Sequence, residues 1–414
     1  MNMLIIGNGF DLAHDRPTKY EHFLQFLELI RRTRRSHENE REFTASMNTE
    51  QLSDHVRNYI LSAFQSRIPK MNAYADNKKP LIQEIYRCLD ENVWYSYFQD
   101  IHSKNKMRGK DWIDFESEIR DIIKFFDNIF GDLYEPIPEN LGRFDGYNDK
   151  IRSFLITFTQ HNKHKSRGSD YKDTCDDFIE KTYQDLEKII RCLEIYLDDC
   201  VGKMPITYYS PDIQEFEIDS VLSFNYTAIP TNIYPSLIQS QSMKTYPSLV
   251  QVHYIHGCAK TDRPMEENNM VLGVNEYWDR PKKDFCTNFN CYKKFVQRII
   301  KETGIDYKKS LEQMRRKYDE IKEIYSRDHP SHTPPYPNHV YIFGHSLDIT
   351  DGDILKEIIQ TPGVDTTIFY RNKQQQANQI ANLSKVLGQD ELLKRTFSIS
   401  PTIIFKQQRD MVKL

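Results

Sequence analysis

The fold of this chain is restricted first by a set of short apolar runs, each of which ends at a glycine. These glycines are Gly7, Gly257, Gly273 and Gly344. Glycine is scarce here, at 15 of 414 residues, so its repeated position after an apolar run is informative. Short runs rich in β-branched and aromatic residues are typical of strands buried on both faces of a parallel sheet. Two more runs, at 218–224 and 366–370, predict two more strands.

Residues 21–214 have a different apolar spacing, with apolar side chains three and four positions apart. The clearest stripes are Phe23, Phe26, Leu27 and Ile30; Phe115, Ile119, Ile122, Phe126 and Ile129; and Ile179, Tyr183, Leu186, Ile190, Leu193 and Leu197. This spacing predicts helices that pack one face against a core. We therefore expect an α/β fold: a doubly wound, mostly parallel, Rossmann-like sheet built from 1–20 and 215–414, which carries an all-helical insertion of residues 21–214.

The composition is that of an ordinary globular protein with no general affinity for polyanions. Lysine plus arginine number 56, aspartate plus glutamate number 60, and the net charge is -4, so binding to nucleic acid is not expected. No apolar run is long enough to span a bilayer, and the first residues read as a strand and not as a leader peptide. Seven cysteines without close pairs encode neither a disulfide framework nor a zinc ribbon. We expect a cytoplasmic protein without a metal site.

A Gly-x-Gly motif follows the first predicted strand. In a dinucleotide-binding fold, a glycine such as Gly7 permits the tight turn and one such as Gly9 lets a phosphate approach the backbone. The third glycine of that fingerprint is absent, because Leu12 stands in its place. A plain strand-to-helix turn explains the same spacing equally well.

Several further motifs accompany the first one. They are GNGFDLAH at 7–14, WIDFE at 112–116, SFNYT at 223–227, IHG at 255–257, LGVNE at 272–276 and GHSLDITD at 344–351. In this order they resemble the AbiH family of bacterial phage abortive-infection proteins, and the resemblance spans nearly the whole chain. Asp15 stands where the family pattern has glycine. The resemblance implies an antiphage effector, with a phage-derived trigger and further copies of the chain as candidate partners.

The same motifs also resemble, more distantly, sirtuins and sirtuin-like antiphage NADases. This resemblance implies that Asn225 positions water and the nicotinamide ribose, and that His256 acts as a base. It implies a nucleotide bound by Gly7, Asn8, Gly9, Phe10, Asp11, Gly257, Gly344, Ser346 and Asp351. The implied reaction is hydrolysis of NAD⁺, as substrate, to nicotinamide and ADP-ribose. The zinc-binding cysteines of sirtuins are missing, so protein deacetylation is not expected.

Two other functions fit the same residues. The pocket could bind a nucleotide as a sensor without turnover, or Asp348, Asp351 and Asp353 could hold a metal for cleavage of nucleic acid. Against the second, these aspartates precede an apolar helical pattern, where acidic residues cap a helix. His256 could equally be a buried structural histidine, and Asn225 a turn residue.

Three further patterns in the sequence contain residues of the kinds that form sites. In a strand, His253 and His256 should face opposite sides, which argues against a shared metal ion. The motif at 112–116 has a packing role or contributes to the pocket. The basic run from Arg31 to Arg35 is expected at a solvated helix end and not in a phosphate site.

Overall fold

The computed structural model describes residues 1–35, 40–48, 52–65, 73–110, 112–130, 148–162, 175–229, 233–234, 239–240, 248–274, 289–328 and 334–414. These residues form two compact units. The sheet unit comprises Met1–Pro17, Pro205–Cys258 and Glu302–Leu414, and the helical unit comprises Thr18–Met204 and Ala259–Lys301. Residues 259–301, which the sequence analysis placed with the sheet, therefore group with the helices.

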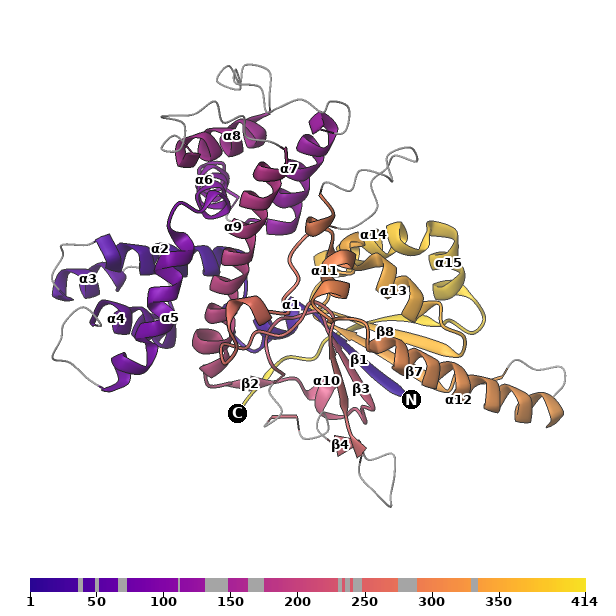
Figure 1. Ribbon diagram of the computed structural model, residues 1–414. Coiled ribbons are helices and arrows are strands. Elements are labelled where there is room, and N and C mark those ends of the chain that lie inside the picture. The colour runs from indigo at the N-terminus through magenta and orange to yellow at the C-terminus, as the bar shows by residue number, and fades with distance from the viewer. Residues whose placement is uncertain are drawn as a thin grey trace. The chain divides into compact units, whose positions relative to one another are not determined.

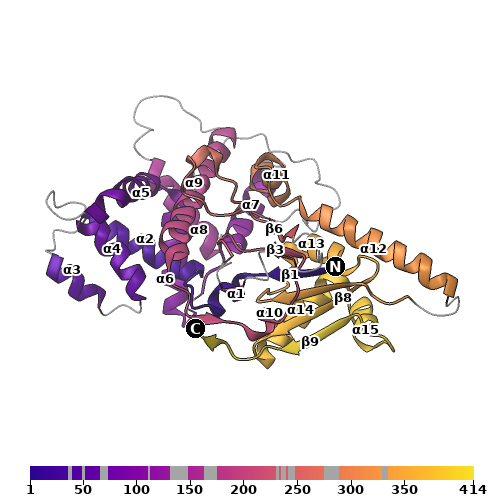
Figure 2. The ribbon, with the colours of Figure 1, turned by 90° about the horizontal axis from the view of Figure 1, so that it is seen from below.

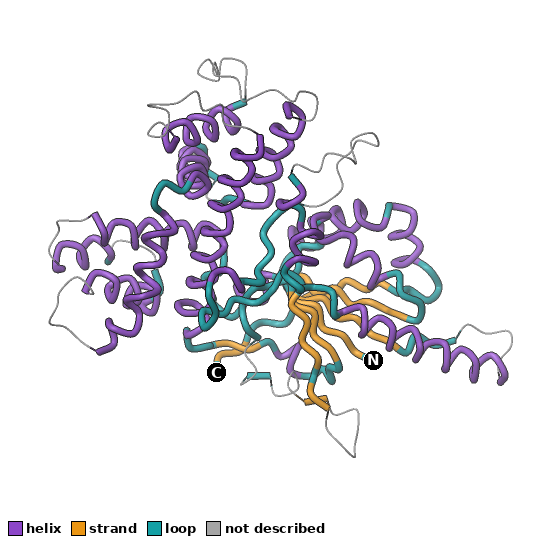
Figure 3. The backbone as a smooth tube through the Cα atoms, in the orientation of Figure 1, coloured by secondary structure: helices purple, strands orange, loops and turns teal. Residues whose placement is uncertain are grey.

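Within the described residues, six strands form one parallel sheet (Figures 1 and 3). They are β1 (Asn2–Ile6), β3 (Ser220–Ser223), β6 (Gln251–Tyr254), β7 (Asn338–Phe343), β8 (Val364–Tyr370) and β9 (Ile403–Gln407). Their order across the sheet is β6-β3-β1-β7-β8-β9. Numbered along the chain this is 3-2-1-4-5-6, the order of doubly wound sheets, in which the direction of winding reverses between β1 and β7. The α/β prediction is confirmed.

The register of the strands separates two apolar faces. Ile5 pairs with Leu222 and Ile342, and all three are buried in one core with residues from α12 (Tyr307–Asp328), α13 (Gly352–Ile359) and α14 (Lys373–Leu387). The alternate residues Leu4 and Ile6 belong to a second core with residues from α1 (Asn8–Ala13) and α10 (Pro211–Gln214). The central strands β1 and β3 are therefore buried on both faces, as their apolar runs predict, whereas the edge strands β6 and β9 are partly exposed.

Three smaller elements complete the sheet unit. The edge strand β9, which the sequence analysis did not predict, lies beside α15 (Gln389–Phe397) in Figure 2. β2 (Tyr208–Tyr209) pairs antiparallel with β10 (Val412–Lys413), and β4 (Gln239–Ser240) pairs with β5 (Ser248–Leu249).

The helical unit contains helices at the three amphipathic stripes named in the sequence, and further helices that the sequence analysis did not predict. Its helices are α2 (Tyr20–Arg35), α3 (Glu40–Met47), α4 (Asp54–Gln65), α5 (Ala73–Leu89), α6 (Val93–Met107), α7 (Phe115–Phe130), α8 (Asp149–Asn162), α9 (Cys175–Ile195) and α11 (Lys294–Ile300). Its core is aromatic: the ring of Phe115 stacks on those of Phe98 and Tyr20, with centroids 4.0 and 4.2 Å apart. No helix of the described residues is long and apolar enough to cross a membrane.

Two sequence motifs belong to the helical unit and are explained by its packing. Asp114 in the 112–116 motif caps α7, because its side chain accepts hydrogen bonds from the amide of Glu116 and the hydroxyl of Ser117, at 3.1 and 2.6 Å. The prediction of a strand that ends at Gly273 is wrong. Instead of pairing with a strand, the backbone of Leu272 bonds the side-chain amide of Gln297 through both its N–H and its C=O, each at 3.1 Å. Residues 275 and 276 of the LGVNE motif lie outside the described residues.

Candidate functional site

The loop after β1 packs directly on the loop after β7, at the point where the sheet reverses its winding. The amide of Gly7 donates to the carbonyl of Phe343 at 3.2 Å, and the amide of Gly9 donates to that of Gly344 at 2.8 Å. The amide of Phe10 donates to Gly7 at 2.8 Å. Gly7, Gly9 and Phe10 were predicted to bind a nucleotide, but their amides bond carbonyls of the chain itself.

This loop-to-loop contact supplies a structural reason for the glycines. A Cβ on Gly9 would lie 2.7 Å from the carbonyl oxygen of Gly344, and one on Gly7 would lie 2.8 Å from the Cα of His345. Gly344 has φ +68°, and its Cβ would lie 2.2 Å from the amide nitrogen of Phe10. Backbone meets backbone here, so no larger side chain fits without separating the loops.

Two other residues near these loops have positive φ. Gly257 has φ +80° and turns the chain directly after His256. Asp15 has φ +61°, a conformation that favours glycine but that aspartate tolerates.

Asn225 ties the end of β3 to the loop after β1. It is 5% exposed, and its Nδ2 donates to the carbonyl of Gly7 at 3.0 Å. Its own amide donates to Ser223 Oγ at 3.2 Å. The side chain thus has a structural role at the carboxyl edge of the sheet, the edge at which open α/β sheets bind ligands.

His256 and His345 approach the same carboxylate. His256 Nε2 lies 3.1 Å from Asp351 Oδ1, and His345 Nε2 lies 3.6 Å from Asp351 Oδ2. Both imidazoles contact the ring of Phe224 edge-on, with centroid distances of 5.6 and 4.5 Å. An ionised carboxylate only accepts hydrogen bonds, so His256 Nε2 carries hydrogen in this arrangement. For His256, Nδ1 is then the nitrogen without hydrogen, and it is buried.

His345 is the site residue to which the sequence analysis gave no role, although it lies in the GHSLDITD motif. The amide of Leu347 donates to His345 Nδ1 at 2.9 Å, which places the hydrogen of the neutral ring on Nε2, toward Asp351. Gln379 of α14 holds the loop by donating to the carbonyl of His345 at 3.0 Å. Leu347 has φ +59°, a strained conformation that this packing maintains.

Of the expectations about neighbouring residues, one is confirmed and two change. Asp348 caps the turn before α13 by accepting from the amide of Thr350 at 3.1 Å, but Asp351 makes no side-chain cap, because its carboxylate faces the two histidines. His253 and His256 were expected on opposite faces. The strand ends at Tyr254, however, so the alternation does not extend to His256. His253 bonds Ser310 of α12 at 3.1 Å, on the same face of the sheet as α13.

The buried side chains of Asp11 and Arg16 form an ion pair near the carboxyl edge of the sheet. The Asp11 carboxylate accepts a hydrogen bond from Thr227 Oγ1 at 2.6 Å and lies 3.7 Å from Arg16. Burial raises the pKa of Asp11 to about 6, against the lowering effects of Thr227 and Arg16. Asp11 is 2% exposed, and its hydrogen bond with Thr227 connects the segments that follow β1 and β3. This structural role accounts for its position without a ligand.

His14 is a structural histidine. Its Nδ1 donates to the carbonyl of Phe10 and its Nε2 accepts from Tyr234 Oη, both at 2.7 Å. Burial lowers its pKa to about 4, so the ring is neutral at physiological pH.

Accessibility divides the remaining predicted contacts. Asn8 and Ser346 are exposed, and Gly9 and Asp351 are partly exposed, whereas Gly7, Phe10, Asp11, Gly257 and Gly344 are buried. Within the described part of the chain, no group of three His, Cys, Asp or Glu side chains is arranged to hold a metal ion.

These features define a class of protein: an α/β protein with a parallel, doubly wound sheet and a histidine–aspartate cluster at the carboxyl edge, joined to a helical unit. The family model of bacteriophage abortive infection AbiH matches residues 3–371. The chain belongs to the AbiH family, and this membership implies a function in phage abortive infection. No curated protein and no solved structure matches the chain. The resemblance to sirtuins stays a prediction.

Proposed function

We propose that this AbiH-family protein is an abortive-infection effector whose sheet unit binds NAD⁺ and hydrolyses it to nicotinamide and ADP-ribose. The Rossmann-like, sirtuin-like character of the sheet is part of the proposal. One observation carries it: His256, oriented by Asp351, lies beside the segment that bears Asn225 at the carboxyl edge of a doubly wound sheet. The residues flanking Asn225 are Phe224 and Tyr226, and their ring centroids lie 5.6 and 6.2 Å from that of His256.

The chemistry demands little beyond positioning and a base. The bond from ribose C1′ to the nicotinamide nitrogen breaks with its electron pair leaving on the neutral nicotinamide. Water attacks C1′ and loses a proton, so the products are nicotinamide, ADP-ribose and a proton. Positioning of the reactants and a modest base are the contributions that a protein makes to such a step.

His256 is suited to be that base. The Asp351 carboxylate fixes its tautomer, with hydrogen on Nε2, and stabilises the imidazolium that forms when Nδ1 takes the proton from water. This is the relation that a carboxylate has to a catalytic histidine in hydrolases. His345 fixes Asp351 from its other oxygen and acts as a positioning residue.

The nucleotide would be held around the exposed ends of the same loops. Asn8 and Ser346 are the exposed members of the predicted set, and they follow β1 and β7, the strands on either side of the reversal of winding. The glycines contribute by letting these two loops pack together.

The test is to incubate the purified chain with NAD⁺ and measure nicotinamide by chromatography. We expect His256→Ala to lower the release of nicotinamide by about 10²-fold or more, the usual contribution of a positioned base. His253→Ala is the matched control: His253 lies on the same strand segment and bonds Ser310 instead of Asp351, so this variant should retain turnover.

Other outcomes would redirect the assignment. Saturable binding of NAD⁺ with no nicotinamide released would identify a nucleotide-binding protein without turnover. Cleavage of RNA or DNA that requires added Mg²⁺ and is lost in Asp351→Ala would support a metal-dependent nuclease.

A further inference from the structure

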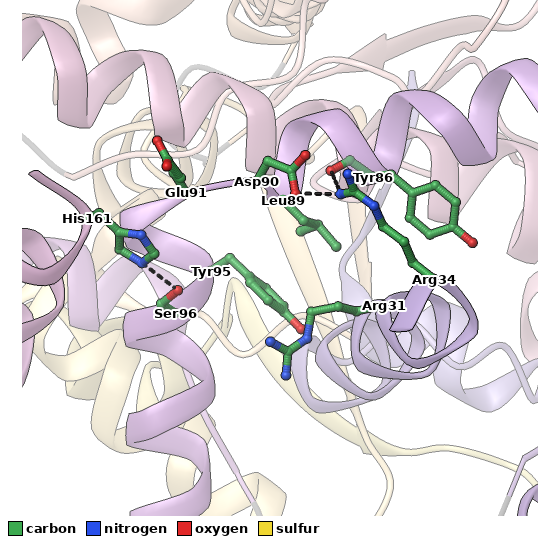
Figure 4. A pocket seen from close by; sticks show the side chains of 9 residues that line it. All are labelled: Arg31, Arg34, Tyr86, Leu89, Asp90, Glu91, Tyr95, Ser96 and His161. Carbon is green, nitrogen blue, oxygen red and sulfur yellow. Dashed lines mark hydrogen bonds and ion pairs between the residues drawn. The ribbon is translucent and has the colours of Figure 1, made fainter. Parts of the chain in front are cut away.

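A cavity of about 410 Å³ lies within the helical unit (Figure 4). It is lined by Arg31, Arg34, Tyr86, Leu89, Asp90, Glu91, Tyr95, Ser96 and His161, which come from α2, α5, α6, α8 and the turn between α5 and α6. Its size is within the range of small-molecule sites. Two members of the basic run that the sequence analysis placed at a solvated helix end, Arg31 and Arg34, therefore line a cavity.

The guanidinium groups of Arg31 and Arg34 are held against tyrosine rings, and each keeps N–H groups that can donate to a ligand. The Cζ atom of Arg31 lies 5.6 Å from the ring centroid of Tyr95, and that of Arg34 lies 5.5 Å from the centroid of Tyr86. Positions three apart on a helix share a face. Both side chains are partly exposed, at 33% and 46%. The tyrosines thus orient two cations on one wall of the cavity.

The bonding pattern of each arginine leaves part of its fork available. Arg31 bonds Glu28 through Nε and Nη2, at 2.9 and 2.8 Å, which leaves Nη1. Arg34 bonds Asp90 and the carbonyl of Tyr86 through Nη1, which leaves Nε and Nη2. Planar guanidinium donors of this kind match the oxygens of a phosphate. Arg34 and Asp90 form an exposed ion pair, and such pairs contribute little free energy. A phosphate can therefore replace the Asp90 carboxylate at Arg34 at little cost.

The turn between α5 and α6, which carries Asp90 and Glu91, is rigid. Asn92 is fully buried, and its Nδ2 donates to the carbonyls of Cys88 and Asp185 at 3.1 and 2.8 Å, while its Oδ1 accepts from the amide of Tyr95 at 2.9 Å. Glu91 has φ +52°, a strained conformation that this network maintains. The carboxylates of Asp90 and Glu91 are therefore placed where they can accept hydrogen bonds from a ligand.

The remaining wall adds neutral polar groups. Ser96 Oγ and His161 Nε2 lie 3.0 Å apart, the contact drawn as a dashed line in Figure 4. Burial lowers the pKa of His161, so the ring is neutral at physiological pH and the two guanidiniums remain the cations of the lining. The cavity thus offers guanidinium donors from α2 and carboxylate acceptors from the turn between α5 and α6.

We propose that this cavity is a binding site for a small phosphate monoester of the size of a nucleoside monophosphate. The phosphate lies at Arg31 and Arg34, and hydroxyl or amino donors of the organic part bond Asp90 and Glu91. This site is separate from the one proposed for NAD⁺ and provides the helical unit of a defence protein with a ligand of its own.

The test uses the full chain and AMP, with adenosine and inorganic phosphate as fragments, in titration calorimetry. We expect AMP to bind saturably, and each fragment to bind at least about tenfold more weakly, because each retains only one half of the contacts. Arg34→Gln and Arg31→Gln should each weaken AMP binding by about tenfold or more, the usual effect of losing a charge-assisted hydrogen bond. Arg120→Gln is the matched control, since Arg120 is an exposed arginine of the same unit, 3.6 Å from Asp121, and it should not change affinity.

Hydrogen exchange separates this site from the sheet unit. AMP should slow exchange in residues 27–35 and 86–98 of the wild-type protein and not in those of Arg34→Gln. The proposal is overturned if AMP does not bind, if adenosine or phosphate alone binds as tightly as AMP, if both arginine variants keep wild-type affinity, or if protection is confined to the loops of the sheet unit.

Discussion

Replacement of Gly344 by alanine tests whether the glycines at the carboxyl edge serve packing. Gly344 has φ +68°, and an added Cβ would lie 2.2 Å from the amide nitrogen of Phe10 and 2.6 Å from the carbonyl carbon of Gly9. Both neighbours are backbone, so no rotamer change relieves the overlap. The loops after β1 and β7 must move apart, and the 2.8 Å hydrogen bond from Gly9 to Gly344 is lost.

The magnitude follows from these two effects. Left-handed backbone costs a residue with a Cβ roughly 1–2 kcal/mol, and loss of a hydrogen bond between partly buried groups costs about 1–3 kcal/mol. Gly344→Ala should therefore lower the free energy of unfolding of the sheet unit by about 3 kcal/mol. Gly388→Ala is the matched control: its φ is +90° and nothing lies within 4 Å of its added Cβ, so it should lose only the roughly 1–3 kcal/mol of backbone strain, without a steric overlap.

The assay is native-state hydrogen exchange of the slowest amides in β1 and β7, which reports the opening free energy of the sheet. Equal losses of stability in Gly344→Ala and Gly388→Ala would refute the reasoning, because the loop contact would then contribute nothing measurable. An intact wild-type opening free energy in Gly344→Ala would refute it more strongly.

Three further predictions concern the site and its pH dependence. His345→Asn, which keeps an acceptor for Leu347 but cannot reach Asp351, should slow nicotinamide release and move the pH profile of the reaction, whereas a purely structural role would leave the profile unchanged. The pKa of His14 falls from 6.5 in the unfolded chain to about 4 in the folded one, so the folded state binds fewer protons between these two pH values. The free energy of unfolding should therefore fall by about 3 kcal/mol as the pH drops from 6.5 to 4, at 1.36 kcal/mol per pKa unit. In urea unfolding curves, His14→Gln should reduce this loss of stability at acidic pH. Thr227→Val should destabilise the protein by about 2 kcal/mol at pH 8, where the Asp11 carboxylate is ionised and needs the hydroxyl donor, and by less at pH 5, where the carboxyl, whose pKa is about 6, is protonated; equal losses at both pH values would contradict the assignment.

The sequence by itself determined the fold class, five of the six strands of the sheet and the helical stripes of α2, α7 and α9. Five of the six strands of the sheet coincide with predicted runs, because strands that are covered on both faces are rich in apolar residues. The helices carry stripes at spacings of three and four, because only one face of each packs on the core. The prediction of a strand before Gly273 is wrong because a short apolar segment shows only that its residues are buried. The local pattern does not say whether the backbone partner is another strand or the side chain of Gln297.

Only the tertiary structure decided the site. The motifs at 7–11, 223–227, 255–257 and 344–351 were visible in the sequence, but the order β6-β3-β1-β7 is what brings them to one edge. The sequence indicated that Gly9 and Gly344 were needed, and the fold shows that each makes room for the other's loop. The strand order, the turn at Gly257 and the position of Asp351 at the start of α13 bring together His256, Asp351 and His345. Such contacts join residues far apart in the chain, and no local periodicity encodes them.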